Sequence, residues 1–168
     1  MADLTTLGVT VHYGVETVKG TKPTTFTWLK RCNAIGGISL DTEQIDVSAL
    51  EDYITQYASG RQDTGGTWEL TFNLNADVIT AIKKLFSDAK TAKGKELRVW
   101  FEVVFPDLSD AFFVVAEPGR EIPLPDIGQN EAATLPLTLV INEYKGLDTK
   151  VVTEEVAQTL DNAKAAVV

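Results

Sequence analysis

Residues 67–74, TWELTFNL, decide the fold class. Apolar and polar side chains alternate along this stretch, and a period of two predicts a β-strand with one buried and one polar face. The same period returns in residues 96–105, ELRVWFEVVF, and in residues 134–141, TLPLTLVI. Weaker strand candidates are residues 25–32, 35–40 and 111–117. The chain is therefore predicted to be mainly β, with antiparallel strands.

The segment after the first of these strands changes to a helical period. Residues 75–95, NADVITAIKKLFSDAKTAKGK, predict an α-helix over about residues 76–93. Asn75 or Asp77 can cap its start, and Gly94 can end it. The predicted buried face consists of Val78, Ile79, Ile82, Leu85, Phe86 and Ala89.

These elements predict one domain over residues 1–146, an antiparallel β-sandwich or partly closed barrel with one flanking helix. The 168 residues are 44% hydrophobic, which is enough for a core of its own. Residues 41–66 are expected to form a long polar loop between strands, and residues 147–168 a C-terminal arm. Because the apolar stripe of the arm is thin, we expect docking to order it.

The sequence contains no motif for catalysis, cofactor binding or metal binding. It has no glycine-rich dinucleotide loop, no Walker loop, no nucleophile elbow and no zinc-protease motif. A single cysteine, Cys32, excludes an intramolecular disulfide, and a single histidine, His12, leaves no Cys/His metal cluster. We expect His12 to lie on the face of a strand, because VTVHYGV alternates. The acid pairs Glu51–Asp52 and Asp107–Asp110 lack the spacing of a calcium loop. We expect neither an enzyme nor a cofactor.

Composition also limits the possible partners and location. The net charge of −9 opposes binding of nucleic acid through its phosphates, which needs clustered Lys and Arg. No apolar run approaches the roughly 18–20 residues of a membrane span, so membrane insertion is not expected. The start, MADLTTLGVTVHYG, lacks the basic and apolar regions of a secretory signal, which predicts folding in a cytoplasm.

The order of elements over roughly residues 5–147 resembles that of the major tail proteins of long-tailed phages, the subunits of the tail tube. The resemblance is carried by four strings of this sequence, which are TFTWLKRCNAIGGISLDTEQIDVSALED, GGTWELTFNLNAD, ELRVWFEVVFPDLSDAFFVVA and ATLPLTLVINEYKG. It implies two packed antiparallel sheets flanked by a helix. It also implies six subunits in a ring and rings stacked into a tube, through which genomic DNA passes without specific binding.

The resemblance further implies partners and a location. The partners are other copies of the chain, a tape measure protein, and the tail completion and baseplate proteins. The location is the virion tail, after assembly in the host cytoplasm. A type VI secretion tube protein has a similar architecture and stays an alternative.

By the same resemblance, the long loop carries the contact between stacked rings, and its apolar residues favour such a contact over a solvated linker. Six acids and one base, Arg61, lie among residues 41–63, and the glycine-rich end is expected to act as a hinge. The predicted ring-stacking residues are Ile45, Asp46, Val47, Leu50, Glu51, Asp52, Tyr53, Tyr57 and Arg61. The predicted contacts of the C-terminal arm are Val152, Val156 and Leu160.

The polar strand faces supply candidates for the wall of the tube lumen. They are Glu69, Thr71, Asn73, Glu102 and Thr138, which on a free sandwich would simply face solvent. Arg98 and Trp100, on the same face as Glu102, are expected to contact a neighbouring subunit.

A different class of function is a monomeric β-sandwich that binds a ligand such as a carbohydrate. Exposed aromatic side chains would form its platform, with Trp28, Trp68 and Trp100 as the candidates. The period places Trp68 on a buried face, which favours core packing instead.

Overall fold

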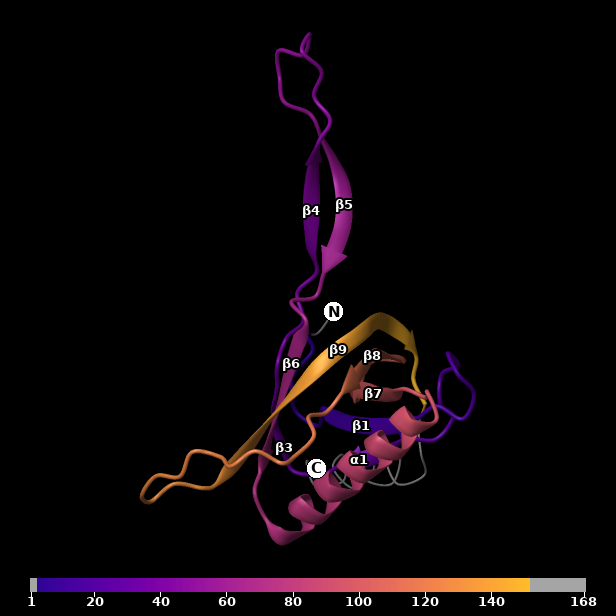
Figure 1. The fold of residues 1–168 in the computed structure, drawn as a ribbon. Coiled ribbons are helices and arrows are strands. Elements are labelled where there is room, and N and C mark those ends of the chain that lie inside the picture. The colour runs from indigo at the N-terminus through magenta and orange to yellow at the C-terminus, as the bar shows by residue number, and fades with distance from the viewer. Residues whose placement is uncertain (1–2, 152–168) are drawn as a thin grey trace.

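The computed structural model describes residues 3–151, so Val152, Val156 and Leu160 of the predicted arm lie outside the described residues. The fold is a seven-stranded antiparallel sheet, a separate two-stranded hairpin and one helix (Figure 1). The elements are β1 (Thr10–Val15), β2 (Thr27–Leu29), β3 (Cys32–Ile35), β4 (Asp41–Asp46), β5 (Tyr57–Asp63), β6 (Thr67–Asn73), α1 (Ala76–Gly94), β7 (Val99–Val104), β8 (Asp110–Glu117) and β9 (Thr134–Thr149). The prediction of a mainly β chain with one flanking helix is confirmed.

The large sheet is strongly curled, because its two edge strands are joined by only two residues. Its strand order is β2-β1-β7-β8-β9-β6-β3, and Lys30 and Arg31 alone separate β2 from β3. In a flat sheet of this order the edges would lie about 29 Å apart. Three Cα–Cα steps span at most about 11 Å, so the sheet must bend until its edges approach. Within residues 3–151 no ladder joins β2 to β3, and the barrel stays open.

The prediction of one strand over residues 25–32 was wrong for a local reason. The backbone of Arg31 adopts a positive φ of 64°, which turns the chain between the two edges. The Arg31 carbonyl accepts a hydrogen bond from the Asn73 amide at 2.9 Å, so the turn is held against the end of β6.

The inner face of the sheet packs against α1 and forms the main core. The alternation in β6 and β9 is confirmed, whereas both faces of β7 are buried; Leu70, Phe101 and Leu139 are fully buried in this core. The Trp68 indole contacts the Phe101 ring edge-on at a centroid distance of 5.7 Å. Its Nε1 donates a 2.7 Å hydrogen bond to the Gly36 carbonyl, so this Trp is a core residue rather than part of a binding platform.

The helix matches its predicted position. The Asn75 side chain accepts a hydrogen bond from the Val78 amide at 2.9 Å, which satisfies a free amide of the first turn. The helix ends at Gly94, but the left-handed residue that terminates it is Glu96, with a φ of 59°. Val78, Ile82 and Leu85 of the predicted apolar face are buried. Ala92, which was not predicted, is buried as well.

A second core covers the opposite face of the sheet, which the sequence had indicated to be half polar. Trp100, Val104 and Phe113 are buried there together with Phe26, which precedes β2. The Trp100 indole donates a 2.6 Å hydrogen bond to the buried Glu16 carboxylate. The expectation that Trp100 contacts a neighbouring subunit was therefore wrong, because residues distant in sequence cover it.

Arg98 has partners within its own chain. Its guanidinium lies 3.2 Å from Glu16 and 2.9 Å from Glu143. Burial raises the pKa of Glu16, but hydrogen bonds from Trp100, Gly20 and Arg98 outweigh it and leave that pKa below its ordinary value.

Residues 41–66 have secondary structure of their own, in contrast to the predicted loop. β4 and β5 pair antiparallel from Asp41 opposite Asp63 to Asp46 opposite Tyr57, with a bulge near Glu43. The hairpin stands away from the body of the molecule (Figure 1). Nearly all side chains of the hairpin are exposed, so neither face of its strands is buried. The sequence therefore shows no alternation of apolar and polar residues that would predict these strands.

β9 is twice as long as predicted and joins the two halves of the sheet. Its first half pairs with β6, and its second half pairs with β8 as far as Thr149. Residues 147–149, predicted as the start of the arm, therefore belong to this strand.

The turn at Arg31 gives a first prediction. We expect Arg31→Gly to raise the free energy of unfolding by up to about 1 kcal/mol, because glycine adopts a positive φ without steric cost. Arg31→Val should lower it by about 1–2 kcal/mol. Urea unfolding measures both. At Arg61, in the middle of β5, the order should reverse, since valine suits a strand better than glycine. Equal stability of the two Arg31 variants would contradict the steric cost assigned to the positive φ of this turn.

Candidate assembly surface

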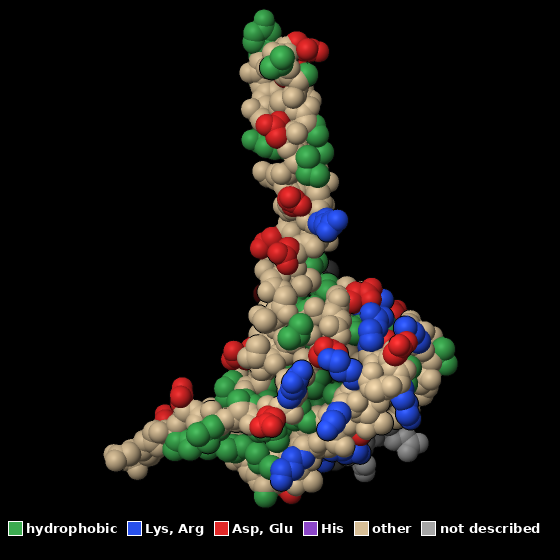
Figure 2. Space-filling view, viewed as in Figure 1, with side chains coloured by type: hydrophobic (Ala, Val, Ile, Leu, Met, Phe, Trp, Pro, Cys, Tyr) green, Lys and Arg blue, Asp and Glu red, His purple; other side chains and the backbone are tan. Residues whose placement is uncertain are grey.

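The hairpin formed by β4, β5 and the tip between them, residues 47–56, exposes most of its apolar side chains. Leu50 and Tyr53 at the tip are fully exposed, and Ile54 is 79% exposed. Ile45 and Tyr57 on the strands are exposed by 47% and 61%. Exposed apolar side chains gathered on one projecting element favour a contact with another molecule. Figure 2 shows it as green patches along the projecting hairpin.

The tip is held by hydrogen bonds within itself. The Asp46 carboxylate accepts from the Ser48 amide at 2.9 Å, and the Asp52 carboxylate accepts from the Ala49 amide at 2.7 Å. The Gln56 amide donates to the Ser48 hydroxyl at 2.7 Å. Hydrogen bonds from Ser48 to the Asp46 carboxylate lower the pKa of Asp46. Of the predicted contact acids, Asp46 and Asp52 therefore shape the tip, whereas Glu51 is exposed without such a bond.

The root of the hairpin is fixed to the sheet by backbone contacts. The Gly36 amide donates to the Glu69 carbonyl at 2.7 Å, which continues the pairing of β3 with β6. Gly65 and Gly66 both have positive φ values near 80°, a conformation that favours glycine. The Gly66 carbonyl accepts from the Ile141 amide at 2.9 Å. The predicted hinge thus coincides with the turn that connects the hairpin to β6.

Four of the five predicted lumen residues share one polar surface on β6 and β9. Glu69 lies opposite Thr138 in the ladder, and both are exposed. Thr71 and Asn73 continue the same face and are half-buried. The Asn73 side chain accepts a 3.0 Å hydrogen bond from Asn33 on β3, which extends this surface across three strands. That the surface lines a lumen stays a prediction.

Glu102, the fifth, does not lie on that surface. It is fully buried on β7, where its Oε1 accepts a 2.8 Å hydrogen bond from the Val151 amide. Burial raises the pKa of Glu102 to about 7, against the opposing effects of the Val151 amide, Lys22 and Lys150. The alternation along residues 96–105 predicted an exposed Glu102, because the sequence pattern does not reveal the second core that covers this face of β7. Glu102 is therefore not retained as a lumen candidate.

His12 lies directly opposite Glu102 in the ladder between β1 and β7. It is buried, and its Nε2 is 2.9 Å from the Thr10 hydroxyl. Burial lowers the pKa of His12 to about 4, so the ring is neutral at pH 7. The strand-face position predicted for His12 is confirmed.

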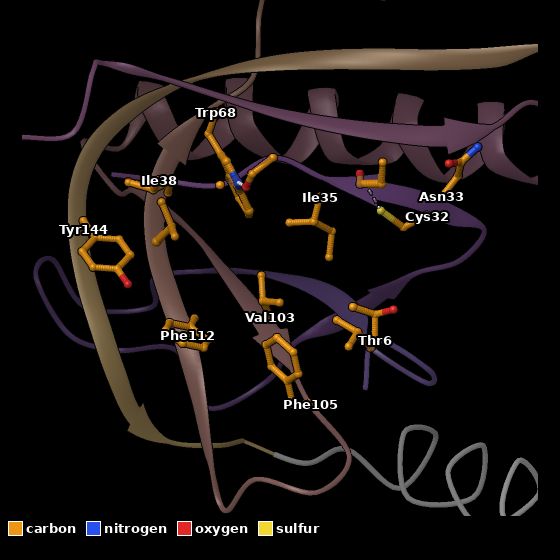
Figure 3. A pocket seen from close by; sticks show the side chains of 15 residues that line it. Thr6, Cys32, Asn33, Ile35, Ile38, Trp68, Val103, Phe105, Phe112 and Tyr144 are labelled. Carbon is orange, nitrogen blue, oxygen red and sulfur yellow. Dashed lines mark hydrogen bonds between the residues drawn. The ribbon is translucent and has the colours of Figure 1, made fainter. Parts of the chain in front are cut away.

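The concave side of the sheet is hollowed next to the root of the hairpin (Figure 3). This hollow has a volume of about 590 Å³ and includes Ile35, Trp68, Phe105, Phe112 and Tyr144 in its lining. Cys32 lies at its edge, and burial raises the pKa of the thiol to about 11, so it stays protonated and unreactive at neutral pH. Within residues 3–151 no group of acidic, His and Cys side chains could hold a metal ion.

A second hollow, which no sequence pattern indicated, lies between α1 and residues 117–121. We call it the α1 groove, and its volume is about 670 Å³. Its basic side chains come from α1, from the residue before β7 and from the segment after β8. They are Lys90, Lys93, Arg98 and Arg120, and the acidic Glu117 and Glu121 also line the groove. Among the described residues no helix is long and apolar enough to cross a membrane.

The fold is similar to that of chains in two solved assemblies. A chain from the tail of an empty GTA particle, computed with helical refinement in C6 symmetry, matches with a TM-score of 0.55 and 16% identity, over 88% of this chain and 99% of that chain. A chain from the six-fold symmetrised baseplate of the anti-feeding prophage matches with a TM-score of 0.48 and 15% identity, over 91% and 99%. No protein-family model and no curated protein matches the sequence. At this level of identity the first likeness establishes a common fold.

The buried pair on β1 and β7 gives a second prediction. The folded chain keeps the Glu102 proton up to about pH 7, whereas the unfolded chain releases it near 4.5, so Glu102 lowers stability as the pH rises through this window. Glu102→Gln removes the effect. We expect it to be as stable as the natural chain at pH 4.5 and more stable by about 1–3 kcal/mol at pH 8, measured by urea unfolding of the monomer.

His12 acts in the opposite sense, because its folded pKa is lowered. The unfolded chain binds its proton below about pH 6.5, so stability falls as the pH drops from there toward 4. Glu102→Gln should therefore show a steeper loss of stability in acid than the natural chain. Glu69→Gln, on the exposed surface, is the control and should leave the pH dependence of the free energy of unfolding unchanged on both the acid and the alkaline side. A Glu102→Gln effect that is equal at pH 4.5 and pH 8 would contradict the assignment.

Proposed function

We propose that this chain is a structural, non-enzymatic subunit of the tail tube of a phage-like particle and that it assembles with copies of itself. The observation that carries the proposal is the projecting hairpin, whose exposed Leu50, Tyr53 and Ile54 are covered by no other part of residues 3–151. The common fold with a chain from a C6-symmetric tail supports the same role. A polymer requires that each copy carries a surface that contacts the next copy, and the exposed hairpin, present on every copy, can supply that surface.

The proposed assembly consists of six-membered rings stacked into a tube that conducts DNA. The polar surface on β6 and β9 supports a lumen wall, because its side chains are neutral apart from Glu69 and offer no cluster of cations to phosphates. The net charge of −9 acts in the same direction. A wall that does not hold DNA allows it to pass.

Further partners belong to the same proposal. A tape measure protein, the tail completion proteins and the baseplate would bind the ends or the interior of the tube, and the location would be the tail of the particle. A secretion tube of the type VI kind would use the same subunit contacts. A monomeric carbohydrate-binding module is disfavoured, since Trp68 and Trp100 are 3% and 4% exposed and cannot join the half-buried Trp28 in an aromatic platform.

The experiment is to concentrate the purified chain and examine it by negative-stain electron microscopy, together with sedimentation velocity. We expect hollow tubes or six-fold rings. A chain that remains monomeric at every concentration, salt and pH tested would overturn the proposal.

The hairpin gives a third prediction. Leu50→Ser combined with Tyr53→Ser should abolish assembly, because these side chains form the apolar part of the contact. The free energy of unfolding of the monomer should change by less than about 0.5 kcal/mol, since both side chains are fully exposed. Val18→Ser, at a 62% exposed apolar residue of the body, is the control and should assemble normally. Tubes formed by the double variant would remove the hairpin from the interface.

A further inference from the structure

The α1 groove has an apolar floor and a rim that carries four basic side chains and two acidic ones, Glu117 and Glu121. Phe86 and Ala89 from α1 and Leu97 and Val99 from the chain that follows it supply the apolar lining. The groove therefore offers apolar contact within reach of positive charge. That combination selects an occupant that is itself apolar and acidic.

The cations of the rim are not all neutralised within the chain. Lys93 lies 3.7 Å from Glu117, and Arg98 binds Glu16 and Glu143. Lys90 and Arg120 are exposed and form no ion pair with another residue of the range 3–151. An acidic group in the groove would meet these two cations without displacing an existing ion pair.

The tip of the hairpin has the complementary character. Leu50, Tyr53 and Ile54 present apolar surface, and Glu51 lies among them with its carboxylate exposed. Along the whole hairpin the acids outnumber the single base, Arg61. Figure 2 shows this contrast, with acidic and apolar side chains along the hairpin and most basic side chains on the body.

The tip cannot reach the groove of its own chain. The hairpin projects from one end of the body, and α1 covers the other end (Figure 1). From Asp41 to Leu50 the chain extends by about 30 Å, directed away from the helix. The complementary occupant is therefore supplied by a second copy.

We propose that the hairpin tip of one copy inserts into the α1 groove of a second copy, with Leu50, Tyr53 and Ile54 on the apolar floor and Glu51 between Lys90 and Arg120. The inference rests on the self-assembly proposed above and names its receptor. Because tip and groove are different surfaces at opposite ends of the molecule, the contact is head-to-tail, and each added copy exposes a new tip and a new groove.

The hollow in Figure 3 is the competing receptor. It is lined by apolar and neutral polar side chains and contains no Lys or Arg. It would accept the apolar residues of the tip but would leave the Glu51 carboxylate without a partner. A buried carboxylate without a partner is costly, and this favours the α1 groove.

Charge reversal tests the pairing. Lys90→Glu and Glu51→Lys should each raise the concentration at half-assembly about tenfold, and the two together should restore it to within about threefold of the natural chain. Lys83→Glu, at another exposed residue of α1, is the matched control and should leave assembly unchanged. If assembly proceeds but the reversals have no effect, or if the combination fails to rescue, the receptor is wrong while the proposed function stands.

Disulfide trapping tests the geometry. In a Cys32→Ser background, a mixture of Leu50→Cys and Lys90→Cys chains should form disulfide-linked dimers under mild oxidation, and a mixture of Leu50→Cys and Lys83→Cys chains should not. In the same Cys32→Ser background, a mixture of Leu50→Cys and Thr6→Cys chains tests the hollow of Figure 3, since a disulfide between them would place the tip there and overturn the proposal. A chain that never assembles would overturn both the proposed function and this receptor.

Discussion

The two-residue link between β2 and β3 determines the shape of this molecule. A seven-stranded sheet whose first and last strands are adjacent in sequence has to curl, and curling creates a concave face that α1 covers and a convex face that needs a cover of its own. Residues 16–26 supply part of that second cover through Phe26, and Glu16 anchors them by accepting hydrogen bonds from Gly20 and Trp100. Both cores of the domain are consequences of the same short turn.

The hairpin follows from the same topology. β3 and β6 are antiparallel neighbours, and β4 and β5 lie between them in sequence. The chain from β3 to β6 is therefore one extended hairpin whose inner part belongs to the sheet and whose outer part has no sheet to join. It must leave the body where β3 ends. Its exposed strands are paired with each other, which satisfies the backbone groups that an isolated extended segment would leave to water.

The sequence predicts the elements that bury one face within the chain, and it fails where burial comes from elsewhere. Leu70, Phe101 and Ile82 follow their periods because each packs into the main core. The hairpin strands carry no period, since neither face of β4 or β5 is buried within one copy. Glu102 looked exposed because the residues that cover it come from distant parts of the chain. The positive φ of Arg31 leaves no trace in residue type, so the break between β2 and β3 could not be predicted.

The candidate site was partly predictable for a physical reason. Apolar residues such as Leu50 and Tyr53 in a polar, acidic segment have no explanation within a single chain, and this mismatch is visible without a structure. What composition could not supply is the direction in which they point. The hairpin projects from one end of the molecule, and α1, which lines the groove, covers the other end, whereas an interface built on a single self-complementary patch would close after two copies. A chain with two unlike, complementary ends has no such limit, and the acidic residues that accompany the apolar tip limit its association with other tips. Like charges repel tip from tip, so that the favourable contact is the one that extends the stack.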